Sequence, residues 1–354
     1  MPARQTVIRV LKFFLVSACI LFSALGDAQT SIDIDDVHIV QRLATSITAS
    51  GDSPQLIVHS DLPIIRTHAN LVLVPVSVTD PMQRIVTGLH MDNFEVFEGK
   101  TPQTIQQFSS EDVPVSLGII LDVSGSMADK IDRVKDAVNQ FCDIANPQDE
   151  FFLISFADEP RLARDFTTNP EDIRKELLLV EPKGRTSLLD AIYMGLHKMK
   201  RARYGKKALL IISDGGDNHS RYGEREVRAL SRESDVMIYS IGIFDRYVAT
   251  LEEQLGPMLL SEIAEPTGGR AFTIDKPNAL ASVARHIGEE LRTQYVLAYR
   301  PQDARHDGKW RKIRVRLRLP RKLAFLQAHA RTGYYASLEP TPPVAITPTA
   351  DTNR

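Results

Sequence analysis

The stretch Val115-Ser116-Leu117-Gly118-Ile119-Ile120-Leu121-Asp122-Val123-Ser124-Gly125-Ser126 decides which fold we expect. Its first seven residues are nearly all apolar, which is the pattern of a strand covered on both faces. The next five residues bring one carboxylate and two hydroxyls at alternate positions, and Gly125 allows a tight turn between them. In an open α/β sheet, ligands bind beyond the carboxyl ends of the strands, so this stretch predicts both a buried strand and a binding site at its end.

Further strands and helices follow in alternation. Apolar runs lie at 151–156, 208–212 and 236–243. Apolar residues recur at helical spacing over 131–145, 188–199 and 280–291. This order predicts an α/β fold with a doubly wound, mostly parallel sheet over residues 114–292.

Strand-like segments flank this region on both sides. Before it we expect strands at 71–79, 86–89 and 94–100, and after it at 294–299, 313–319, 323–330 and 333–335. Each flank is too small for us to expect that it folds by itself. We therefore expect segments 29–113 and 293–336 to form one smaller β-domain, with the α/β domain inserted between them.

The chain begins with the order of features found in a secretory signal. Three basic residues precede the apolar run 13–25, and small residues follow it at Gly26-Asp27-Ala28. We expect 1–28 to be a cleaved signal peptide and the protein to be secreted, periplasmic or in the cell envelope. An uncleaved anchor or a lipid on Cys19 are the alternatives, and these are the only membrane attachments that the sequence predicts. We interpret 337–354, rich in Pro and Thr, as a disordered tail.

Composition narrows the class of protein. The chain has 354 residues, with 43 Lys and Arg against 45 Asp and Glu, and 43% of it is hydrophobic. These values are typical of a soluble globular protein, and the near-neutral charge gives no reason to expect a nucleic-acid partner. Without the signal only Cys142 remains of two cysteines, and its helical neighbours predict a core thiol.

Two later segments supply oxygen atoms that match the first motif. Gly184-Arg185-Thr186-Ser187 precedes a predicted helix, and Ser213-Asp214-Gly215-Gly216-Asp217 follows a predicted buried strand. All three segments lie where the chain leaves the sheet or enters a helix, so we expect them to meet at one edge. The candidate ligands are Asp122, Ser124, Ser126, Thr186 and Asp214. Such hard oxygen donors favour Mg²⁺, with Mn²⁺ or Ca²⁺ possible.

These five residues, in this order and on these elements, resemble the von Willebrand factor type A domain with its metal-ion-dependent adhesion site. The flanking segments, which include Asp92-Asn93-Phe94 and a closing Gly333-Tyr334-Tyr335, are similar to a bacterial exported subfamily. The resemblance implies that the serines and the threonine bind the metal directly or nearly so, and that the aspartates act directly or through water. It also implies a protein partner with an exposed Asp or Glu carboxylate.

Other interpretations remain open at this point. Asp122 and Ser126 alone could serve a helix N-terminus, with Ser126 as the N-cap. A metal-assisted hydrolase, or an assembly or chaperone-like subunit of an envelope complex, is the alternative function. We expect no enzyme, because the sequence has no Gly-x-Ser-x-Gly elbow, no HExxH and no phosphate loop. If no metal is bound, Asp122 and Asp214 should repel each other, so that removing Asp214 could stabilise the fold.

A row of cations stands apart from this site. Lys312, Arg314, Arg316 and Arg318 alternate with apolar residues. Such a row could bind a polyanion or anionic lipid headgroups. The interpretation that the sequence favours is the solvent face of an edge strand, on which cations prevent aggregation.

Overall fold

The computed structural model describes residues 71–338, except 215, 245–250 and 304. All of these residues belong to one compact unit, Arg66–Arg354. The predicted signal at 1–28 and the segment 29–70 lie outside the described residues, as does all of the predicted tail except 337 and 338. Within the described part of the chain, no helix is both long and apolar enough to span a bilayer.

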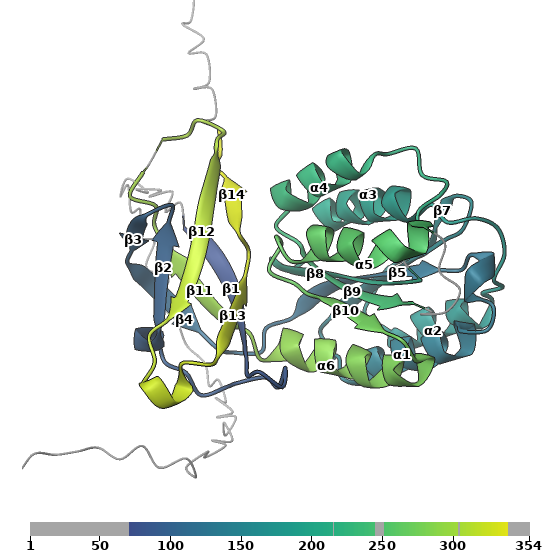
Figure 1. The fold of residues 1–354 in the computed structure, drawn as a ribbon, viewed down its shortest axis with the longest axis horizontal. Helices are drawn as coiled ribbons and strands as arrows, with labels where there is room; N and C mark the ends of the chain where they lie inside the picture. The colour runs from purple at the N-terminus through teal and green to yellow at the C-terminus, as the bar shows by residue number, and fades with distance from the viewer. Residues whose placement is uncertain (1–70, 215, 245–250, 304, 339–354) are drawn as a thin grey trace, which may run out of the picture. The chain divides into compact units, whose positions relative to one another are not determined.

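A six-stranded sheet forms the centre of the α/β domain (Figure 1). In the order in which they pair, its strands are β10 (Ala271–Ile274), β9 (Met237–Ile243), β8 (Lys206–Ser213), β5 (Val115–Asp122), β6 (Glu150–Phe156) and β7 (Pro160–Thr167). All neighbours are parallel except β6 and β7, which are antiparallel. Every residue of β5 and β9 is buried, as expected for inner strands with helices on both faces. The predicted fold class is confirmed.

Helices cover both faces of this sheet (Figure 1). One face packs against α1 (Ile131–Asp143), α2 (Pro170–Leu178) and α6 (Leu280–Arg292). The other packs against α3 (Leu188–Lys198), α4 (Glu224–Glu233) and α5 (Leu251–Ala264). Cys142 of α1 is buried in the first of these two cores, where burial raises the pKa of its thiol to about 12. The predicted core thiol is therefore confirmed.

The segments on either side of the α/β domain share two four-stranded sheets. One has the order β13 (Gln327–Ala330), β1 (Val72–Thr79), β11 (Tyr295–Tyr299) and β4 (Ile105–Ser109). The other has the order β14 (Gly333–Tyr335), β12 (Trp310–Leu317), β2 (Phe94–Glu98) and β3 (Thr101–Gln103). Apolar side chains of β1, β2, β11 and β12 form a core of their own. We call these two sheets the β-domain.

One expectation about these flanks was wrong, and a second holds only in part. Segment 86–89 is not a strand: the only pairing nearby is an isolated bridge between Ile85 and Thr79, and Gly88 has a φ of +81°. A left-handed glycine interrupts the extended backbone that a strand needs. The expected edge strand is only partly an edge: β12 lies between β14 and β2, but β14 pairs only with Trp310–Lys312, and the rest of β12 pairs with β2 alone.

Short 3₁₀ turns connect several of these elements. They are η1 (Met91–Asn93), η2 (Gly125–Met127), η3 (Met199–Arg201), η4 (Pro277–Ala279) and η5 (Arg321–Leu323). Of these, η2 matters most for function, because it carries the end of the polar motif that follows β5.

Candidate metal site

Asp122 is the last residue of β5 and is completely buried. Its Oδ1 accepts a hydrogen bond from the Ser124 backbone amide at 2.9 Å, and its Oδ2 accepts one from the Ser213 hydroxyl at 2.6 Å. Two bonds from two neighbouring strand ends hold this carboxylate in one orientation. Burial, followed by the negative charge of Asp214, raises the pKa of Asp122 to about 6. The surroundings of Asp122 therefore disfavour the ionised form of its carboxyl group.

The two serines of the motif lie next to each other. The Ser124 and Ser126 hydroxyl oxygens are 3.0 Å apart, and Ser126 is exposed whereas Ser124 is buried. The helix that follows, α1, begins only at Ile131, and Lys130 occupies its N-cap position. The interpretation of Ser126 as a helix N-cap is therefore wrong, because η2 separates the motif from the helix.

The second loop contacts the first through its backbone. The Gly125 amide donates to the Gly184 carbonyl at 3.0 Å. Gly184 has a φ of +85°, and a Cβ there would meet Asp158 Oδ2 at 2.6 Å, so that glycine fits best at this close approach. Two residues later, buried Thr186 is tied to the third loop, because its amide donates to Asn218 Oδ1 at 3.1 Å and its carbonyl accepts from the amides of Asn218 and His219.

The third loop brings a second buried carboxylate. Asp214 directly follows β8 and is 3% exposed. Its Oδ2 accepts from the Lys130 ammonium at 3.2 Å, and the same ammonium donates to the Ser126 carbonyl at 3.1 Å. Lys130 therefore connects the first loop to the third. The sequence analysis missed this residue, because nothing near it in the chain indicates a partner 84 positions away.

Lys130 changes one expectation about Asp214. Repulsion from Asp122 alone predicts that removal of Asp214 could stabilise the metal-free fold. The structure supplies a cation that offsets this repulsion, and the Lys130 side chain is only 15% exposed. Removing Asp214 would leave that ammonium buried without its partner carboxylate, which costs free energy. We therefore no longer expect a gain in stability.

The residues fit a hard divalent cation. Two carboxylates and three hydroxyl residues come from loops that bond to one another at the carboxyl end of β5 and β8. Among the described residues, no three His, Cys, Asp or Glu side chains form a group that could hold a metal ion. Three of the five proposed ligands are instead hydroxyl side chains. Such oxygen donors suit Mg²⁺ better than zinc. These residues would hold the ion.

The acidic side chains at the rim are already engaged. Asp158 pairs with Arg185, and Glu159 pairs with Arg221. Asp217 accepts a hydrogen bond from the Ser220 hydroxyl at 2.6 Å and another from the Leu189 amide at 3.3 Å. Hydrogen bonds from Arg185 lower the pKa of Asp158, which makes this carboxylate a weaker general base, whereas burial raises the pKa of Asp217.

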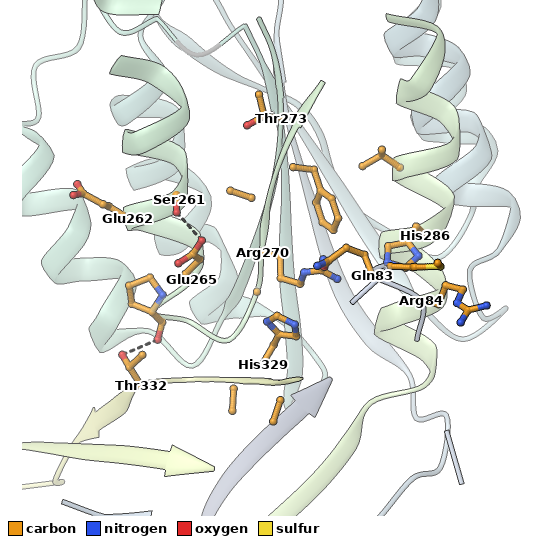
Figure 2. A pocket seen from close by; sticks show the side chains of 18 of the residues that line it. Gln83, Arg84, Ser261, Glu262, Glu265, Arg270, Thr273, His286, His329 and Thr332 are labelled. Atoms are coloured by element: carbon orange, nitrogen blue, oxygen red, sulfur yellow. Dashed lines mark hydrogen bonds between the residues drawn. The ribbon is translucent and has the colours of Figure 1, made fainter. Parts of the chain in front are cut away.

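A cavity of about 1120 Å³ lies elsewhere, and Figure 2 shows it. It is lined by residues of the α/β domain, including Arg270 and His286, by Gln83 in the loop after β1, and by His329 of β13. None of the five predicted metal ligands lines it. Arg270, central in Figure 2, hydrogen-bonds to Gln83 and forms an ion pair at 2.8 Å with completely buried Glu290. This cavity is therefore separate from the metal motif.

Parts of this chain are similar to one known protein family and to two known proteins. Residues 117–216 match the family described as von Willebrand factor type A domain. An uncharacterized protein of Borreliella burgdorferi is 25% identical over 181 residues, which cover 44% of this chain and 53% of that protein. Inter-alpha-trypsin inhibitor heavy chain H4 of Bos taurus is 28% identical over 117 residues, which cover 30% and 13%. The chain thus spans about half of the length of the first relative and much less of the second.

One solved structure is similar to part of this chain. BatB from Bacteroides thetaiotaomicron is 19% identical, with a TM-score of 0.41, and the similarity covers 50% of this chain and 98% of that one. The match at 117–216 begins within β5 and ends just past Asp214, so it includes all five predicted ligands. With the six-stranded sheet and the two helical layers around it, this match identifies a von Willebrand factor type A domain in the chain.

Proposed function

We propose that Asp122, Ser124, Ser126, Thr186 and Asp214 hold a divalent cation, and that the domain binds a protein partner through this ion. Mg²⁺ is the first choice, and Mn²⁺ or Ca²⁺ could replace it. The observation that carries the proposal is the pair of buried carboxylates at the ends of adjacent strands β5 and β8. Because two close carboxylates in a buried setting are costly, a bound cation would stabilise them.

The chemistry of the ligands indicates the partner. Hydroxyl ligands are neutral, so a bound divalent ion keeps much of its charge and can accept an anionic oxygen from another molecule. Gly125 and Ser126 are exposed, which leaves one side of the motif accessible. A partner with an exposed Asp or Glu side chain fits this requirement. From the order of features in 1–28 we propose that the protein acts after export, as a secreted or envelope protein.

A metal-assisted hydrolase is the competing function. It would need a general base beside the ion, and hydrogen bonds from Arg185 lower the pKa of the rim acid Asp158, which weakens it as a base. We therefore favour binding without catalysis.

The test is metal-dependent capture by the full chain and its Asp214→Asn variant. Wild type should gain thermal stability from Mg²⁺ and retain an acidic protein from the exported fraction with Mg²⁺ but not with chelator. Asp214→Asn should lose both effects, because the neutral amide no longer offers the negative charge that a hard divalent ion prefers. Asp132→Ala, which removes an exposed carboxylate from α1, is the matched control and should behave as wild type. The proposal fails if Mg²⁺ neither stabilises nor binds wild type.

A further inference from the structure

One face of the β-domain carries a row of cations. Lys312, Arg314 and Arg316 of β12, and Arg318 just after it, are all exposed. Of the residues between them, Ile313 belongs to the core of the β-domain, and Val315 and Leu317 pack against it. Since side chains alternate along a strand, the four cations share the outer face of the sheet. We call them the basic row.

The basic row has no acidic partner in the described part of the chain. None of its four side chains lies within ion-pair distance of a carboxylate there, although Glu95 stands opposite Arg316 in the strand register. Arg314 donates to the Gly99 carbonyl at 3.2 Å, and the Arg316 guanidinium lies over the Phe97 ring at 5.1 Å.

Arg311 shows that a cation of the same strand can have acidic partners. It points to the opposite face and lies within 4 Å of three acids, Glu98, Asp303 and Asp307. The uncompensated charge is therefore confined to the outer face.

Edge protection accounts for only part of the basic row. Proteins place lysine and arginine on edge strands to prevent pairing with other chains. In this sheet the edges are β14 and β3, and β12 lies between β14 and β2. β14, however, pairs only with Trp310–Lys312, so the side of β12 that faces away from β2 has no strand partner beyond Ile313 in the described part of the chain. Protection of this open side explains cations there, but it does not explain a continuous row that also includes Lys312.

Aromatic side chains border the basic row. Trp310 and Tyr335 stand opposite each other in the register of β12 and β14, with ring centroids 5.0 Å apart, and Tyr335 is 42% exposed. A Cβ at Gly333 would lie 2.4 Å from the Trp310 ring, so the glycine leaves space for the indole across β14. Tryptophan and tyrosine with nearby cations are typical of surfaces that meet the headgroup region of a bilayer.

We propose that this outer face binds the surface of an anionic lipid bilayer. The cations follow one another every second residue along a strand, roughly 6.5–7 Å apart, and so present a straight line of charge to a flat array of headgroups. Residues of the basic row do not line the cavity of Figure 2, and the aromatic pair at one end can enter the interface. Each basic residue near an anionic membrane strengthens binding roughly fivefold. This proposal does not depend on the metal site.

The test uses the full chain, chelator throughout, and vesicles of phosphatidylcholine with or without phosphatidylglycerol. The apolar run 13–25 is common to all samples, so the difference between the two vesicle types reports the electrostatic part of binding. We expect stronger binding to the anionic vesicles, weakened by salt. Trp310 is the single tryptophan of the chain, so a blue shift of its emission and its quenching by brominated lipid locate the contact on this face.

Two variants of equal charge complete the experiment. The first changes the basic row by Lys312→Gln, Arg314→Gln, Arg316→Gln and Arg318→Gln, and should lose anionic binding by roughly a hundredfold or more. The control changes four exposed cations of the α/β domain to Gln: Lys175, Lys200, Arg225 and Lys276. It should bind as wild type does.

Three results would overturn the proposal. They are equal binding of wild type to both vesicle types, an equal loss in the control, or binding to soluble heparin without any shift of Trp310 emission on vesicles. The last result would favour a polyanionic chain in place of a bilayer.

Discussion

Lys130 determines the charge that a metal ion would meet at the motif. Its ammonium contacts Asp214 at 3.2 Å, and it neutralises part of the negative charge that Asp122 and Asp214 share. A divalent cation that binds Asp214 must therefore compete with this ammonium. Under the proposed function, this lysine should stabilise the metal-free protein and weaken its affinity for the metal.

We predict that Lys130→Met binds Mg²⁺ roughly tenfold more tightly than wild type, because a charged hydrogen bond of about 1.5–3 kcal/mol no longer opposes the metal. Without metal the variant should unfold at lower temperature, since two buried carboxylates lose their cation. Titration calorimetry and thermal melts with chelator measure the two effects. Lys135→Met on the same helix is the control. Unchanged Mg²⁺ affinity in Lys130→Met would show that the ammonium does not compete.

The sequence predicted those residues of the candidate site that belong to short local motifs. Asp122, Ser124 and Ser126 lie within five residues, and the polar ends of the predicted strands and helices pointed to Thr186 and Asp214. The structure brings the loops of these residues together by hydrogen bonds, such as that between Gly125 and Gly184. Lys130 could not be predicted, because its contact with Asp214 depends on where α1 begins relative to the loop after β8.

At the scale of elements, strongly apolar strands were predictable and weakly patterned ones were not. The runs that became β5, β6, β8 and β9 have buried side chains on both faces, which leaves an unmistakable signal. In contrast, β7 contains three charged residues and no buried one, since it is the antiparallel edge of the sheet. Its extended form depends on pairing with β6, and this partner is not visible in its own sequence.

The junction of β8 with the end of α6 gives a pH-dependent prediction. The Lys206 ammonium bonds to the Leu291 carbonyl, and burial, followed by the charge of Arg292, lowers the pKa of Lys206 to about 8. The folded state therefore disfavours the charged lysine. The free energy of unfolding is therefore lowered in full below pH 8, where Lys206 is charged in both the folded and the unfolded state. This loss disappears as the pH rises toward 10.5.

We predict that Lys206→Met stabilises the protein at pH 7 by about 1–3 kcal/mol, and that this gain shrinks toward pH 10. Urea unfolding at both pH values measures it. Lys207→Met, one residue along β8, is the control. A gain that does not depend on pH would mean that the methionine acts through packing alone.

At the scale of the whole molecule, strands from two distant parts of the sequence share each sheet of the β-domain. β1 pairs with β11 and β13, and β2 pairs with β12. These partners lie about two hundred residues away along the chain. Alternating patterns predicted most of these strands, but pairing across an inserted domain rests on long-range packing that no local pattern contains.

Polar contacts also cross between the β-domain and the α/β domain. Gln294 donates to Ser77 Oγ of β1 at 3.2 Å and to the Tyr239 hydroxyl of β9 at 3.1 Å. Tyr239 in turn donates to Glu290 of α6, which is completely buried. Loss of the segment after α6 would therefore leave buried polar groups in both domains without partners, which adds to the cost of losing the strands themselves.

We predict that a chain ending at Arg292 keeps a folded α/β domain but loses the β-domain. Residues 71–113 should then be cleaved rapidly by protease, because β1 and β2 lose β11, β13 and β12, and a few strands without a covered apolar face are not stable alone. Limited proteolysis with mass spectrometry follows the cleavage sites, and circular dichroism follows the helices. A chain ending at residue 338 is the control and should resist cleavage there. If 71–113 stayed protected in the shorter chain, the first flank would be an independent fold and the two flanks would not form one domain.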